Sequence, residues 1–287
     1  MTTTEITPRV DPDAELGVLA RLRWALIDCW TIVVQELTHL VRQPSVFAWQ
    51  IGTPIVMVLM FVYVFGSAMD VTGHGAGVGY IDFAMPGLFV MTISFGFMNT
   101  AYAVTLNKEK GFIDRFRSMP MSSSAVVTGR SVSDIILAVV DMLVIAAIAL
   151  AVGWRSGGSL GATLLAFVLL LWLRVSLIFV GIWLGLRIRT SESAGNLFAV
   201  AFPFAFISSV FTPPTLMPTW LGTVAAWNPI SSTAGAIREL FRTPGLEVFT
   251  GGAWIEGHAM AAAVVWPAVV IAVFAPLAVR EFARLGR

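Results

Sequence analysis

Six windows of the sequence are apolar over about 20 residues each, the length that a helix needs to cross a lipid bilayer. They lie at residues 47–68, 83–106, 131–153, 160–186, 194–211 and 260–279. The fifth window is the shortest and contains Pro203, and the sixth contains Pro267 and Pro276, so kinks are expected in both. The pattern predicts an all-α polytopic membrane protein with six transmembrane helices.

The overall composition agrees with this fold class. Hydrophobic residues make up 57% of the chain and charged residues 12%, whereas roughly 25% of an ordinary soluble domain is charged. The net charge of +1 offers no basic surface for a nucleic acid. The single cysteine, Cys29, excludes a disulfide framework and a thiolate metal cluster. We therefore expect no metal, cofactor or nucleic acid on this chain.

Lysine and arginine fall mostly on one side of the predicted spans. They occur before the first span, in the loop 107–130, after the fourth span and after the sixth. The positive-inside rule therefore places both termini and this loop in the cytoplasm. Residues 1–18 are acidic, contain prolines and predict a disordered cytoplasmic tail. Residues 19–43 form an amphipathic pattern that Pro44 ends, which is typical of an interfacial helix along the lipid headgroups.

The stretch between the fifth and sixth windows is interrupted by turn-forming prolines rather than being uniformly polar. Its apolar pieces, over residues 214–245, are too short to cross the membrane. Such pieces could enter the outer leaflet and return, provided that protein or water satisfies their ends. We expect two short outer re-entrant helices there.

The most charged stretch, "EKGFIDRFRSMPMSSS" at 109–124, combines acids and bases with phenylalanines. A helix would place Phe112, Phe116 and Met119 on one stripe, because they are spaced i, i+4 and i+7. Pro120 would end that helix. A helix this short is marginal alone in water, so its aromatic stripe needs a surface to pack against. The periodicity leaves two surfaces open, the membrane and a groove on a protein partner.

These residues resemble a permease of the type-2 ABC exporter family, which includes the daunorubicin-resistance permeases. The segment "MPGLFVMTISFGFMNTAYAV" (85–104) is similar to the second span of that family, and "EKGFIDRFRSMPMSSSAVVTGR" (109–130) to its cytoplasmic loop. The segment "WNPISSTAGAIREL" (227–240) resembles its outer segment before the last span. Together with the six-span layout, the resemblance covers most of the chain beyond about residue 40.

The resemblance implies a subunit that moves amphipathic drugs, antibiotics or lipids out of the cytoplasm across a bacterial plasma membrane. It implies two permease subunits, identical or related, assembled with two separate ATP-binding subunits, and a solute that passes between the permeases. Residues 108–121 would form a coupling helix seated in a cleft of the ATP-binding subunit, and residues 19–43 a connecting helix. The implied coupling residues are Glu109, Lys110, Gly111, Phe112, Asp114, Arg115, Phe116, Arg117, Met119 and Pro120. The outer segment would be a gate that includes Trp227, Asn228 and Pro229.

The sequence contains no G-x-x-x-x-G-K-[ST] phosphate-binding loop. Its only lysines are Lys108 and Lys110, and neither follows a glycine-rich loop. We therefore expect that this chain is not an enzyme by itself, and that a partner subunit binds the ATP and Mg²⁺.

Three charged residues fall inside the apolar windows, where an unpaired charge costs at least a few kcal/mol. Asp141 and Arg174 lie at similar depths in the third and fourth windows, which a short loop joins, so they are expected to pair near the middle of the bilayer. The pair could fix the two helices or serve as a substrate site. Asp134 lies near the cytoplasmic end of its window, where water can reach it, and needs no special role.

An aromatic and sulfur-bearing stripe with one amide runs along the second window. Its members are Phe95, Met98, Asn99 and Tyr102. Such a stripe is usually helix packing, but flexible methionine and flat rings also tolerate varied apolar ligands. This face is therefore the candidate substrate path.

Two other functions are weighed against the exporter. An ion-coupled secondary transporter could use Asp141 and Arg174 as a relay, although no inverted repeat is evident and the two halves differ in loop pattern. An intramembrane enzyme would need a catalytic grouping or metal-ligand set at membrane depth, and the sequence offers none.

Overall fold

The computed structural model describes Val34, Thr38 and residues 44–65, 80–111, 123–212, 214–243 and 253–284. Every regular element within these ranges is a helix. The long helices are α4 (Tyr80–Glu109), α6 (Ser123–Val152), α7 (Leu160–Arg187) and α13 (Ala259–Arg284). Each contains a stretch long and apolar enough to cross a membrane. The chain is therefore a multi-pass α-helical membrane protein.

The predicted windows correspond to these helices only in part. The second, third, fourth and sixth windows fall on the four long helices. The first corresponds to α2 (Pro44–Leu59) and the π-helix η1 (Met60–Phe65), whose apolar part is shorter than a span. The fifth corresponds to two short helices, α8 (Ser191–Gly195) and α9 (Leu197–Phe206). Four spans are thus supported among the described residues, and the count of six stays a prediction.

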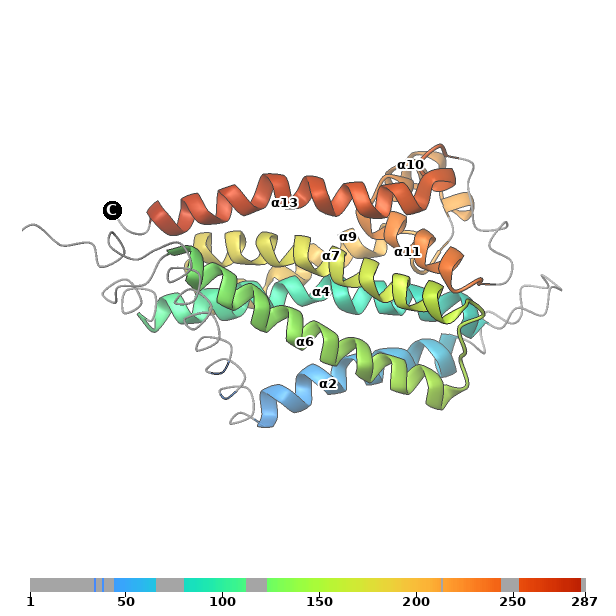
Figure 1. Cartoon of the computed structure of the whole chain (residues 1–287), viewed down its shortest axis with the longest axis horizontal. Coiled ribbons are helices and arrows are strands. Elements are labelled where there is room, and N and C mark those ends of the chain that lie inside the picture. Colours follow the sequence, from blue (N-terminus) through green and yellow to red (C-terminus); the bar gives the residue numbers. More distant parts are fainter. Residues whose placement is uncertain are drawn as a thin grey trace, which may run out of the picture.

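Along the bundle, α4, α7 and α13 run in one direction and α6 runs in the opposite direction (Figure 1). At one end α4 and α7 finish and α6 begins, and we call this the Glu109 end. The opposite end, called the Pro229 end, holds the short elements of the predicted outer segment. These are η3 (Pro214–Leu216), α10 (Thr219–Ala226) and α11 (Pro229–Leu240). The 3₁₀ turn η4 (Glu256–His258) then leads into α13.

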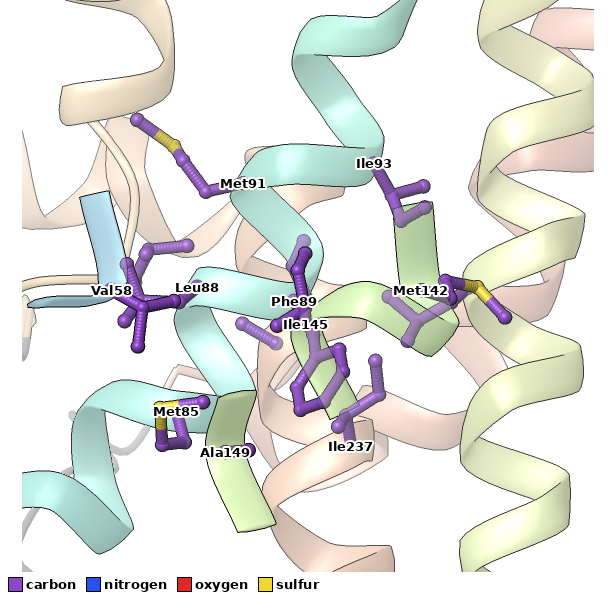
Figure 2. Close-up of a cluster of buried hydrophobic side chains, with 14 of the residues drawn as sticks. Val58, Met85, Leu88, Phe89, Met91, Ile93, Met142, Ile145, Ala149 and Ile237 are labelled. Atoms are coloured by element: carbon purple, nitrogen blue, oxygen red, sulfur yellow. The ribbon is translucent and has the colours of Figure 1, made fainter. Parts of the chain in front are cut away.

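The largest hydrophobic cluster is built around α4 and reaches the Pro229 end. Figure 2 shows the α4 side chains of this cluster between Val58 of α2 and Ile145 of α6. Phe89 is the largest of its fully buried side chains. Its ring lies 6.0, 5.7 and 6.2 Å, centroid to centroid, from the rings of Trp154, Phe167 and Phe241. These contacts join α4 to α7 and to the end of α11.

The closest approach between long helices lies between α4 and α7, toward the Glu109 end. A Cβ atom at Gly181 would lie 2.6 Å from the carbonyl oxygen of Phe97, and one at Gly185 would lie 2.6 Å from that of Ala101. Two glycines four residues apart allow two membrane helices to pack backbone against backbone. The Thr105 hydroxyl donates a hydrogen bond to the Gly185 carbonyl oxygen at 3.0 Å, which ties the helices at this point.

Several predicted features lie outside the described residues. These are the cytoplasmic tail (1–18), the connecting helix (19–43) apart from the helical residues Val34 and Thr38, and most of the coupling helix. The coupling residues concerned are Phe112, Asp114, Arg115, Phe116, Arg117, Met119 and Pro120. These features stay predictions.

Candidate transport site

The first three predicted coupling residues form the end of α4. The Lys110 N–H donates to the Leu106 carbonyl oxygen at 3.0 Å, and the Gly111 N–H donates to that of Lys108 at 3.1 Å. Gly111 has a φ of +69°, in the left-handed region that glycine adopts without strain at the end of a helix. The sequence therefore ends α4 at Glu109, where the predicted coupling segment begins.

Lys108 and Glu109 both contact the turn that joins α7 to α8. The Lys108 ammonium donates to the Leu186 carbonyl oxygen at 2.8 Å and also to that of Ile188. The Glu109 carboxylate accepts a hydrogen bond from the Ser191 N–H at 2.9 Å. The last turn of α4 thus binds the end of α7 through the Lys108 ammonium and the start of α8 through the Glu109 carboxylate.

A charge cluster extends this contact to α13. Glu281 lies 3.7 Å from a guanidinium nitrogen of Arg187 and 3.7 Å from one of Arg284. The same carboxylate attracts Lys108 electrostatically. Salt bridges this exposed contribute about 1 kcal/mol or less each. They nevertheless show that α4, α7 and α13 meet at the Glu109 end.

A buried polar network joins α4, α6 and α7 deeper in the bundle. Asp134 of α6 forms a 2.9 Å salt bridge with Arg130 and accepts a hydrogen bond from the Thr100 hydroxyl at 2.8 Å. The Arg174 guanidinium donates to that hydroxyl at 3.4 Å. Asp134 is 2% exposed and Arg174 is 5% exposed. The expectation that water reaches Asp134 is therefore wrong.

Gly96 explains how Arg174 fits at this depth. A Cβ atom at Gly96 would lie 2.1 Å from a terminal guanidinium nitrogen of Arg174, so any larger residue would force that group to move from its place against α4. The Thr100 hydroxyl links this guanidinium to Asp134, because it accepts a hydrogen bond from Arg174 and donates one to the Asp134 carboxylate. The pairing of Asp141 with Arg174 stays a prediction, because the hydrogen bond of Arg174 runs to Thr100.

The predicted substrate stripe lies on an open face of α4. Tyr102 is 44% exposed and Asn99 is exposed, while Phe95 and Met98 are half-buried. The Phe95 ring packs against α9, with centroids 5.7 Å from Phe198 and 6.3 Å from Phe202. The stripe therefore borders a second helix rather than standing alone.

The rings on α9 form a continuous series, which we call the phenylalanine ladder. Phe198, Phe202 and Phe206 follow one another every four residues, with centroids 4.9 and 4.4 Å apart. The series continues through Phe211 at 4.8 Å to Phe61 of η1 at a further 4.4 Å. Sequence reasoning missed these residues, although the i, i+4, i+8 spacing on α9 was a visible signal.

The predicted gate residues form a joint at the Pro229 end. Asn228 caps α11 by accepting from the Ile230 N–H at 2.9 Å, and its amide donates to the carbonyl oxygens of Phe204 and Ile207 at 3.1 and 2.7 Å. Pro229 is the first residue of α11, and Trp227 is 52% exposed. Asn228 therefore ties the end of α9 to the start of α11, and the gating role stays a prediction.

Arg238 makes a second link near this joint. Its guanidinium is buried and donates to the carbonyl oxygens of Ser209 and Val210, at 2.8 Å each. It also lies 4.1 Å from the ring centroid of Phe83 on α4. The backbone that follows α9 is therefore held by α11 and placed beside α4.

Long apolar helices, a buried ionic network and a series of aromatic rings on α9 define a polytopic membrane protein with the features of a transport subunit. A sequence profile described as ABC-2 type transporter matches residues 27–241. The chain belongs to this family, which confirms the resemblance found in the sequence. It is a membrane permease subunit of an ABC exporter, and such a subunit works with an ATPase partner.

Individual relatives agree with this assignment. The chain is 31% identical over 263 residues to the daunorubicin resistance ABC transporter permease protein DrrB1 of Streptomyces coeruleorubidus, covering 88% of this chain and 87% of that protein. It is 23% identical over 218 residues to the putative transport permease ycf38 of Porphyra purpurea, with 73% and 75% covered. The probable multidrug ABC transporter permease YbhR of Escherichia coli (strain K12) is 23% identical over 185 residues, which are 63% of this chain and 50% of that protein.

Proposed function

We propose that this chain pairs with a second permease subunit, identical or related, and that the pair exports amphipathic drugs, antibiotics or lipids from the cytoplasm across the plasma membrane. ATP and Mg²⁺ would be bound by the separate ATPase subunits. The observation that carries the proposal is the face of α4 and α9 on which the phenylalanine ladder packs against Phe95, in the same stripe of α4 as the exposed Asn99 and Tyr102. Relatives named for daunorubicin resistance and for multidrug transport support this substrate class.

The polarity of this face supports a route rather than a lipid-facing surface. Asn99 lies within a helix long enough to span the membrane and is exposed. An amide that faces hydrocarbon leaves its donors and acceptors without partners, which costs free energy. A second subunit or a polar group of the solute would remove that cost. The adjoining rings offer flat apolar faces on which a planar solute can stack.

The direction of transport rests on the charge distribution. The Glu109 end carries Lys108, Arg187 and Arg284, and the positive-inside rule favours the cytoplasm for that end. The segment that follows Gly111 would then reach the ATPase. The Pro229 end, with α10 and α11, would face outward and form the gate. Family membership favours this reading over an ion-coupled transporter that uses Asp141 and Arg174.

Loss of the coupling phenylalanines is expected to detach the ATPase. When the tagged permease is purified in detergent with its ATPase, the Phe112→Ser/Phe116→Ser variant should retain about tenfold less ATPase than the parent, because central aromatic anchors dominate protein interfaces. The measurement is the ATPase to permease ratio after affinity purification. Phe204→Ser removes an exposed ring from α9 and should leave the ratio unchanged.

Equal retention in the double variant would contradict the coupling role of residues 108–121. Transport by the permease alone would contradict the exporter itself, if it survived ATP depletion and stopped when the proton gradient was collapsed.

Removing one ring from the ladder is expected to slow export. Phe202 contacts Phe198 and Phe206 of the ladder and also Phe95 of α4, and each aromatic pair contributes about 0.5–1.5 kcal/mol beyond its buried area. ATP-driven accumulation of rhodamine 6G in proteoliposomes should therefore fall about fivefold in Phe202→Ala. The control is Phe204→Ala, which removes a 57% exposed ring from the same helix. Equal losses in both variants would show that the ladder is not the route.

A further inference from the structure

The last two residues of α4 bind the turn between α7 and α8 with opposite charges. The Lys108 ammonium holds the carbonyl oxygens of Leu186 and Ile188. The Glu109 carboxylate holds the N–H of Ser191, the first residue of α8. The turn at residues 188–190 is therefore bound to α4 by hydrogen bonds at both of its ends. We call these three hydrogen bonds the α4 clamp.

The clamp suits the chemistry of the groups that it joins. The last carbonyl groups of a helix lack partners within the helix and carry a partial negative charge, so a cation stabilises them. The N–H of Ser191, in the first turn of α8, likewise has no acceptor within its own helix. A carboxylate is a strong acceptor for such a group. If the two charges were exchanged, the carboxylate would face carbonyl oxygens and the ammonium would face an N–H group. Each charge would then meet a partial charge of its own sign.

The clamp lies between two parts of the molecule that the proposed function connects. The turn after α4 ends with Gly111, two residues beyond Glu109, and the segment assigned to the ATPase follows directly. On the other side, α8 is joined to α9 through Asn196. The Asn196 N–H donates to the Glu192 carbonyl oxygen at 3.3 Å, and the Asn196 carbonyl oxygen accepts from the Ala199 N–H at 3.0 Å. Hydrogen bonding is therefore continuous from α8 into the helix that carries the ladder.

We propose that Lys108 and Glu109 are positioning residues that make α8 and the start of α9 move together with the end of α4. A displacement that the ATPase imposes on the coupling segment would then shift the Phe198 and Phe202 rings. This inference rests on the proposed function, and it names the contact by which ATP hydrolysis acts on the solute route. In a merely structural role the clamp would stabilise the fold without affecting how much solute moves for each ATP.

The test compares solute moved with ATP hydrolysed in the assembled complex. Permease and ATPase are reconstituted together in proteoliposomes, and rhodamine 6G accumulation and phosphate release are measured in the same sample. In Lys108→Met and in Glu109→Gln, the ratio of transport to hydrolysis should fall about fivefold or more, the lower range of coupling between sites. Lys108→Arg, which keeps a cation, should recover much of the ratio.

Two neighbouring charges provide matched controls. Arg189 lies on the gripped turn and Glu192 in the first turn of α8, and both side chains are exposed. Arg189→Gln and Glu192→Gln should keep the parental ratio. An unchanged ratio in Lys108→Met and Glu109→Gln, with the ATPase still bound, would overturn the clamp. Failure of the parent complex to couple ATP to transport would instead overturn the proposed function.

A second measurement uses the unaltered complex, in case the variants do not fold. Hydrogen exchange is followed with and without a non-hydrolysable ATP analogue. The analogue should change the protection of amides near residues 106–111 and near residues 191–199 together, because the clamp joins them. A change near 106–111 with no change near 191–199 would overturn the inference.

Discussion

The Gly181→Ala/Gly185→Ala variant is expected to lose about 2–5 kcal/mol of stability, because each added methyl group overpacks the interface between α4 and α7. The new Cβ atoms would lie 2.6 Å from the carbonyl oxygens of Phe97 and Ala101. Backbone groups cannot rotate away as a side chain can, so the two helices must separate. Separation would also lengthen the hydrogen bond from the Thr105 hydroxyl to Gly185.

Thermal unfolding of the purified permease in detergent measures this effect. A loss of this size should lower Tm by about 5–15 °C for a chain of this length. Gly161→Ala is the matched control, because Gly161 lies in the first turn of α7 with no atom within 4 Å of its would-be Cβ. That control should keep or slightly raise Tm, since alanine favours a helix more than glycine does. Equal Tm values for the control and the double variant would refute close packing at these glycines.

Asp134→Asn is expected to be the most damaging single change in the buried polar network. It would remove the carboxylate that pairs with Arg130 and that the Thr100 hydroxyl links to Arg174. Breaking a buried ion pair by removing one partner costs about 3–5 kcal/mol, because the remaining charge is left uncompensated. The expected result is a large loss of folded, monodisperse permease, and of Tm in whatever can be purified.

A double-mutant cycle identifies the acid on which Arg174 depends. Arg174→Met is combined with Asp134→Asn in one cycle and with Asp141→Asn in the other. Because the Thr100 hydroxyl links Arg174 to the Asp134 carboxylate, the coupling energy of Arg174 with Asp134 should be the larger one. Arg155→Met is the control, since Arg155 is exposed and lies in the loop before α7. A larger coupling with Asp141 would restore the mid-bilayer pair as the main contact.

Hydrophobic length was sufficient to predict the four long helices. Each of α4, α6, α7 and α13 contains a stretch apolar enough to cross a membrane, and lipid leaves such a segment little alternative to a helix. The fifth window differs because Asn196 ends α8 and starts α9 there. The apolar content of a window does not reveal such a break between two helices. The window therefore appeared as one span, whereas the structure has two short helices.

The error at Asp134 arose from a helix boundary. The sequence window began at residue 131, which placed this acid in the first turn of a span and next to water. In the structure α6 begins at Ser123, so three turns of helix separate Asp134 from that end. The residues before the window are too polar to be counted as membrane, yet they continue the same helix.

The contacts of the candidate site were the hardest to predict because they join distant parts of the chain. Lys108 and Glu109 bind residues near 190, about 80 positions along the chain. No periodic pattern encodes such a pairing. Gly96 gave no signal either, because its role depends on a guanidinium from α7. The G-x-x-x-G spacing at 181–185 was visible, and it would have predicted the close approach of α7 to another helix.

The joint at Asn228 has a consequence for how α9 can move. The Asn228 amide holds the carbonyl oxygens of Phe204 and Ile207 at one end of this helix, while α8 and Glu109 hold the other end. Because α9 is attached at both ends, it can rotate about the line that joins the two attachments. It cannot move along its own axis unless one attachment breaks. The rings of α9 would therefore sweep sideways across the solute, which turns them toward or away from it without carrying it along the helix axis.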